Sequence, residues 1–144
     1  MCGAHAAVRH LLGGVLASDE TVTIVDMEAG LEHLSRGTGR HVDMLLVTME
    51  PYYKALETAR RSAELGRELG IARVLGVANK IRDAEDSRAV RDYAAAHEVR
   101  IIAEIPFDDE LRRADLQDRA PIECVTSPAV QAIERLSRSP ELSP

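Results

Sequence analysis

The chain has 144 residues, a length typical of one domain with a sizeable core, and 45% of the residues are hydrophobic. Its net charge of −6 gives no basic surface for nucleic acid or an anionic membrane. It has no apolar run near the ~18 residues of a membrane span, no signal peptide, and two cysteines that make no disulfide framework. We therefore expect a cytoplasmic protein without a transmembrane segment or a nucleic-acid partner.

Four apolar segments predict buried strands, because they are rich in valine, isoleucine and leucine without regular alternation: 21–27, 42–49, 72–79 and 99–105. Helical patterns lie at 52–70 and 84–98, with shorter ones at 4–17, 30–36, 108–116 and 127–138. Strands that alternate with helices favour an α/β three-layer sandwich with a mainly parallel sheet. We expect one α/β domain over 1–138 and a flexible tail over 139–144, which is polar and proline-containing.

The predicted strands are each followed by polar residues. Because parallel strands end at one edge of a sheet, we call this the carboxyl edge, and ligands of α/β proteins bind there. The polar clusters are Asp26–Gly30, Glu50–Pro51, Asn79–Lys80 and Pro106–Asp109. Four such clusters predict a ligand site more strongly than any one of them does.

Each cluster fits a binding role and a purely structural one. Asp26 ends its predicted strand where P-loop nucleotide-hydrolysing enzymes keep a Mg²⁺ acid, but Asp26 and Glu28 also fit a strand end and a helix cap. The Asn79 amide has the donor and acceptor that a purine edge requires, or Asn79 is a turn residue. The segment 105–115 is either the wall of a base pocket or a plain strand-to-helix connection with an acidic N-cap.

Three segments occur together in this order: "VDMEAGLEHLSRGTGRHVDMLLVTMEP", "VANK" and "IPFDDELRRAD". They resemble the MinD/ParA-type P-loop ATPases. Within these, the resemblance is closest to the CooC-type accessory ATPases, which help insert nickel into carbon monoxide dehydrogenase. It covers nearly the whole chain, and it implies ATP and Mg²⁺ as cofactors and a homodimer that closes around ATP.

The resemblance implies roles for the first segment. Asp26 is implied to be the Walker B-like Mg²⁺ acid. Glu28 is implied to contribute to the nucleotide site, and Ala29 with Gly30 to form a switch that senses the γ-phosphate.

The resemblance also implies a base site. Asn79, followed by Lys80, is implied to recognise adenine, and Pro106, Phe107 and Asp108 are implied to line the base pocket.

The chain departs from this family at the phosphate loop. It has Gly13–Gly14 but no Gly-Lys-Ser or Gly-Lys-Thr, so the Walker A segment that cradles phosphates is missing. We expect the C-terminal part of a longer protein, or alternatively a naturally shortened gene. In either case the prediction is a partial P-loop NTPase fold, without ATP hydrolysis by this chain alone.

The missing Walker A strand has a structural consequence. It would lie between the predicted strands at 21–27 and 42–49. Unpaired buried backbone groups are costly, and an open sheet edge invites pairing with another chain. Either these two strands pair directly, or the chain is unstable or associates.

The chain also departs from the family at its metal motif. The family carries Cys-x-Cys at the dimer interface, whereas this chain has Cys2 alone. A pair of Cys2 thiolates from two subunits suits Ni²⁺ or Zn²⁺, and the alternative is a poorly ordered terminus without a metal.

Two functions follow from these observations. The first is the C-terminal part of a CooC-type ATPase that serves carbon monoxide dehydrogenase or another metalloenzyme client. The second is a non-catalytic α/β module that binds or regulates a full-length homologue.

Overall fold

A three-stranded parallel sheet organises the computed structural model, which describes residues 22–26 and 42–143. The strands are β1 (Met44–Met49), β2 (Arg73–Ile81) and β3 (Arg100–Pro106), in the order β1-β2-β3. They confirm the strands predicted at 42–49, 72–79 and 99–105, because runs of branched apolar residues suit strands that helices cover.

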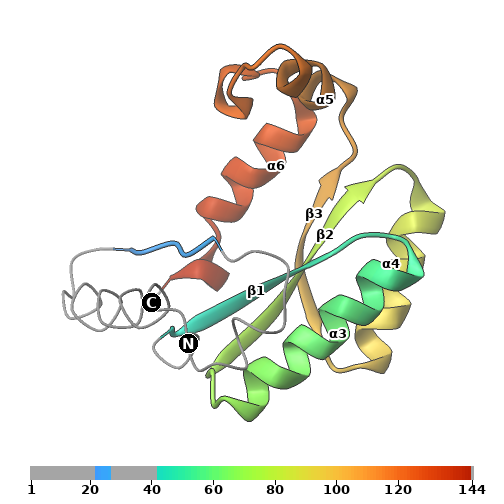
Figure 1. Cartoon of the computed structure of the whole chain (residues 1–144), viewed down its shortest axis with the longest axis vertical. Helices are drawn as coiled ribbons and strands as arrows, with labels where there is room; N and C mark the ends of the chain where they lie inside the picture. Colours follow the sequence, from blue (N-terminus) through green and yellow to red (C-terminus); the bar gives the residue numbers. More distant parts are fainter. Residues whose placement is uncertain (1–21, 27–41, 144) are drawn as a thin grey trace, which may run out of the picture.

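Helices lie on both sides of this sheet, which confirms the α/β fold class (Figure 1). α3 (Tyr53–Glu68) and α4 (Ala84–Ala96) pack on one face, and α6 (Pro128–Ser137) packs against β3 from the other. Along the chain, α5 (Asp109–Leu116) and the 3₁₀ helix η2 (Pro121–Glu123) come between β3 and α6, and the 3₁₀ helix η3 (Pro140–Leu142) follows α6. The helices predicted at 4–17 and 30–36 lie outside the described residues.

The helices begin and end at residues suited to these positions. Asp83 caps α4, because its carboxylate accepts hydrogen bonds from the Glu85 and Asp86 N–H groups, both at 2.9 Å. Gly70 follows α3 with a φ of 80°, a left-handed conformation that favours glycine and suits the end of a helix. In the part of the chain that the structure describes, no helix has both the length and the apolar character of a membrane span.

The main core lies between the sheet and the helices α3 and α4. Met49 of β1 and Val90 of α4 are fully buried there, and small residues such as Ala63 let the helices approach the sheet closely. Gly76 of β2 is placed so that an added Cβ would lie 2.6 Å from the Ile101 Cδ1 atom. A side chain at this position would therefore require the neighbouring side chains to shift.

The predicted strand at 21–27 is wrong for its described part. Residues 22–26 form no strand, and Val22 and Ile24 are 83% and 89% exposed. Among the described residues β1 pairs with β2 alone, so direct pairing of residues 22–26 with β1, one of the two alternatives considered, is not present. A hydrophobic segment becomes a strand only where a neighbouring strand takes its backbone hydrogen bonds, and the described chain supplies none to this segment.

The segment predicted as a flexible tail makes specific contacts in its described part. The Arg73 guanidinium donates hydrogen bonds to the Ser143 carbonyl oxygen at 2.7 Å and to that of Glu141. The Arg100 guanidinium pairs with the Glu141 carboxylate at 2.5 Å. Two arginines at the starts of neighbouring strands thus hold the chain near residue 141.

Candidate functional site

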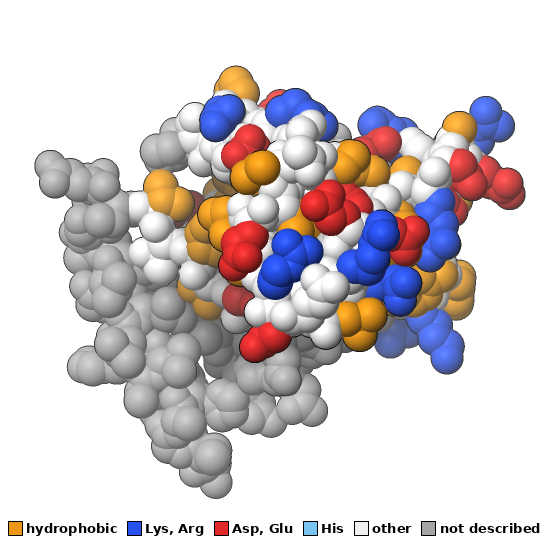
Figure 2. Space-filling view, turned by 90° about the horizontal axis from the view of Figure 1, so that it is seen from above, with side chains coloured by type: hydrophobic (Ala, Val, Ile, Leu, Met, Phe, Trp, Pro, Cys, Tyr) orange, Lys and Arg blue, Asp and Glu red, His pale blue; other side chains and the backbone are white. Residues whose placement is uncertain are grey.

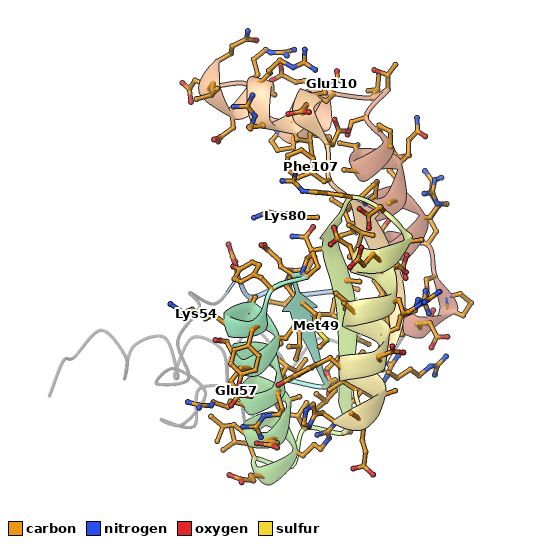
Figure 3. The ribbon with its side chains drawn as sticks, turned by 90° about the vertical axis from the view of Figure 1, so that its right-hand side faces the viewer. Met49, Lys54, Glu57, Lys80, Phe107 and Glu110 are labelled. Carbon is orange, nitrogen blue, oxygen red and sulfur yellow. The ribbon has the colours of Figure 1, made fainter. Side chains whose placement is uncertain are left out.

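Three of the four predicted polar clusters meet at the carboxyl edge of the sheet. Lys80 Nζ lies 2.8 Å from Glu50 Oε1, which joins the ends of β2 and β1. The Phe107 N–H donates to the Ile81 carbonyl oxygen at 2.9 Å, which joins the end of β3 to that of β2. Figure 3 shows Lys80 and Phe107 at this same end of the molecule, with Glu110 of α5 beyond them.

The end of β2 is not a regular strand. Lys80 has a φ of 58°, in the left-handed region, and the pairing of β2 with β3 shifts register between Ala78 and Ile81. This conformation costs a residue other than glycine about 1–2 kcal/mol. The Lys80 side chain forms an ion pair with Glu50, and the hydrogen bond in this pair raises the pKa of Lys80 above its ordinary value.

Asn79 lies in the same irregular stretch and is half-buried. No hydrogen bond joins its side-chain amide to another described residue, and none of the buried polar side-chain atoms in that part of the chain lacks a partner. The amide therefore has its donor and acceptor available at the surface. Two such groups on one planar side chain match the edge of a purine base, as the sequence predicts.

Phe107 follows β3, and the guanidinium of Arg82 lies over its ring. The Arg82 guanidinium carbon lies 4.0 Å from the centroid of the Phe107 ring, within the range of a cation–π contact. Pro106 is the residue of β3 that pairs with Ile81 of β2. The predicted base-pocket residues Pro106 and Phe107 are therefore fixed next to the end of β2.

Asp108 acts as the N-cap of α5. One of its oxygens accepts a hydrogen bond from the Glu110 N–H at 2.7 Å, and the other accepts one from Ser127 Oγ at 2.6 Å. The Ser127 hydroxyl is the largest cause that lowers the pKa of Asp108 below its ordinary value. The acidic N-cap that the sequence offered as an alternative is confirmed, and both carboxylate oxygens are used within the protein.

Among the remaining predicted site residues, the structure describes Asp26 alone. Asp26 is exposed, and within residues 22–26 and 42–143 no hydrogen bond or ion pair connects it to Lys80 or Asn79. Glu28, Ala29, Gly30 and Cys2 lie outside the described residues.

The candidate site suits the base of a nucleotide better than its phosphates. A half-buried amide and an aromatic ring suit a base, whereas the sequence has no Gly-Lys-Ser or Gly-Lys-Thr loop for phosphates. The described residues contain no group of three or more histidine, cysteine, aspartate or glutamate side chains that could hold a metal ion. Figure 2, seen from above Figure 1, shows acidic and basic side chains interspersed on this side of the molecule.

Sequence reasoning missed two residues that shape this edge. Arg82 stacks on Phe107, and Ser127 is completely buried against Asp108. The serine before Pro128 is a recognisable helix start, and it accepts a hydrogen bond from the Val130 N–H. Nothing in the sequence signals that Arg82 meets Phe107, because the two residues are distant in sequence and meet only where the ends of β2 and β3 pair.

The fold is that of a MinD-like protein. The chain superposes on the MinD cell division protein of Aquifex aeolicus with a TM-score of 0.71 and 18% identity, over 94% of this chain and 61% of that one. It superposes equally well, at the same identity, on a chain of the MinC:MinD complex of this organism, of which it covers 59%. At this identity the likeness shows the fold alone, and it is consistent with a partial P-loop NTPase fold.

Relatives in sequence are nearer. The chain is 37% identical to the carbon monoxide dehydrogenase accessory protein CooC of Rhodospirillum rubrum, over 80% of this chain and 43% of that protein. It is 33% identical to an uncharacterized ATP-binding protein of Methanocaldococcus jannaschii, over 94% of this chain and 52% of that protein. No protein-family model matches. The resemblance to MinD/ParA-type P-loop ATPases, and among them to CooC, is confirmed, and the chain spans about half the length of these relatives.

Proposed function

We propose that this chain is the C-terminal part of a CooC-type ATP-binding protein. The observation that carries the proposal is its similarity, over 80–94% of its length, to relatives named as CooC and as an ATP-binding protein. The carboxyl edge supports it, because Asn79 and Phe107 offer an amide and a ring where α/β folds bind ligands. Asn79 and Lys80 serve the base side of the site, with Pro106 beside Phe107.

In the complete protein, we propose that a homodimer closes around ATP and supports nickel insertion into carbon monoxide dehydrogenase or another metalloenzyme client. Asp26 would hold Mg²⁺, which neutralises phosphate charge when it is bound. Glu28 would contribute to the nucleotide site, and Ala29 with Gly30 would respond to the γ-phosphate. Cys2 would hold Ni²⁺ or Zn²⁺ with its counterpart in the second subunit. These roles rest on the resemblance to CooC.

Nucleotide binding tests the proposal. We expect ATP to bind the purified chain weakly, and Asn79→Ala to raise the Kd at least about tenfold, since a site built to hydrogen-bond a base loses those contacts. The measurement is a titration of ¹⁵N-labelled protein with ATP, followed by amide chemical shifts. Gln131→Ala, an exposed amide on α6, is the matched control. If ATP leaves the spectrum unchanged, the ATP-binding proposal fails for this chain.

A second function is favoured by the open side of β1. Among the described residues β1 has a strand on one side only, and the sequence has no phosphate loop. Such a chain can act as a non-catalytic module that binds or regulates a full-length homologue. Co-purification with a full-length homologue that survives both Asp26→Ala and Asn79→Ala, without nucleotide binding, would favour this function over the first.

A further inference from the structure

Arg82, which the predicted site did not include, stacks on Phe107, which it did include. The Arg82 guanidinium carbon lies 4.0 Å from the ring centroid, so the guanidinium covers one face of the ring. Arg82 is exposed and Phe107 is half-buried. The pair therefore presents a flat, positively charged surface at the carboxyl edge.

The backbone holds both members of this pair. The Phe107 N–H donates to the Ile81 carbonyl oxygen at 2.9 Å, and the Arg82 N–H donates to Asp86 Oδ2 at 3.0 Å. Asp86 belongs to the first turn of α4, which Asp83 caps. Two hydrogen bonds to neighbouring segments thus hold the backbone at the two residues whose side chains stack.

The Arg82 guanidinium forms no ion pair with another described residue. Several arginines there pair with carboxylates, such as Arg60 with Glu57 and Arg91 with Glu104, but no carboxylate pairs with the Arg82 guanidinium among residues 42–143. Its N–H donors and its outer face are therefore available. A guanidinium plane stacks on π-systems, which an ammonium group cannot do.

We infer that Arg82 is a base-binding residue of this site, whose guanidinium stacks on the base of a bound purine nucleotide. The base lies on the outer face of the guanidinium, with Phe107 behind it and the Asn79 amide at the same edge of the sheet. This inference rests on the proposed nucleotide binding and adds the side chain on which the base stacks. Stacking holds the flat face of a base whatever its edge groups are, and it does not involve the phosphate chain.

The test compares Arg82→Ala with Arg82→Lys by the same chemical-shift titration, using ATP, adenosine and inorganic tripolyphosphate as probes. Arg82→Lys keeps the positive charge and removes the plane. We expect both variants to weaken binding of ATP and adenosine about tenfold and to leave tripolyphosphate binding unchanged. Arg88→Ala, an exposed arginine on α4, is the matched control and should bind as the wild type does. Thermal melts followed by circular dichroism verify that every variant is folded.

The outcomes separate this inference from the proposal on which it rests. If the wild type binds neither ATP nor adenosine, the proposed function fails, and the inference fails with it. If the wild type binds ATP and Arg82→Lys binds equally well, charge alone suffices and stacking is refuted. A loss of tripolyphosphate binding without a loss of adenosine binding also refutes stacking, because it places Arg82 against phosphate.

Discussion

At the scale of single residues, Asp108 links the candidate site to the fold. It caps α5, and it accepts a hydrogen bond from Ser127, which caps α6. We expect Asp108→Ala to lower the free energy of unfolding by about 1 kcal/mol or more, since removal of an N-cap side chain costs about this amount. Urea unfolding at pH 7, followed by circular dichroism, measures it.

The charge of Asp108 makes this contribution depend on pH. Because the folded-state pKa is lowered, the stabilisation is complete above the unfolded pKa of about 3.9 and is lost as the pH falls through the folded pKa. Asp108→Asn keeps a capping side chain without the charge, so its stability deficit should shrink between about pH 5 and pH 2. Asp109→Asn, at the neighbouring exposed acid, is the control. An equal pH dependence in the two variants would contradict this role.

At the scale of elements, the outer side of β1 has no neighbouring strand among the described residues. The strand reads Met-Leu-Leu-Val-Thr-Met, without a charge or a proline, and Leu46 is 40% exposed. Uncharged edge strands pair with other chains, whereas a lysine on the strand discourages such pairing. We expect the chain to self-associate with increasing concentration, and Leu46→Lys to weaken this association about tenfold. Sedimentation velocity over a concentration series measures it.

The control for this prediction is a lysine placed elsewhere. Leu116 of α5 is 73% exposed and lies outside the sheet, so Leu116→Lys should leave the association unchanged. If the wild type stays monomeric throughout, or if both variants weaken association equally, then β1 is not the surface through which copies meet.

The sequence predicted those elements whose signals are local. The bounds of the strands β2 and β3 and of the helices α3 and α4 were predicted to within a few residues. Branched apolar runs, and capping residues such as Asp83, determine the structure of their own segment. Residues 22–26 carry the same apolar signal, but hydrophobicity does not reveal whether a partner strand exists. At the site, the clusters at the strand ends were found, whereas the stacking of Arg82 depends on contacts distant in sequence.

At the scale of the whole molecule, the described sheet carries a candidate base site, and the sequence has no phosphate loop. We expect the purified chain to show no ATP hydrolysis above the buffer rate, because no Gly-Lys-Ser or Gly-Lys-Thr segment is present to hold the phosphates. A phosphate-release assay measures this, with the full-length CooC of Rhodospirillum rubrum as a comparison. Turnover that disappears in Asn79→Ala would contradict the prediction and assign catalysis to this chain.

The size of the native protein decides how far these proposals extend. An antibody against the segment Arg-Ser-Pro-Glu-Leu-Ser-Pro, followed by intact mass measurement, identifies the species present in its own cells. A mass well above 15.8 kDa would assign the ATPase proposal to a longer protein. A mass of 15.8 kDa would direct attention to a separate binding partner.

Arg73 and Arg100 bind the C-terminal segment at one end of the sheet, and the candidate site lies at the other end. These arginines begin β2 and β3, so they hold the segment around Glu141 at the end of the sheet opposite the carboxyl edge. A fluorescent label attached near Ser143 would therefore report the docking of this segment while leaving the candidate nucleotide site clear. The two ends of the same three strands can be followed independently, one by the label and the other by the ligand.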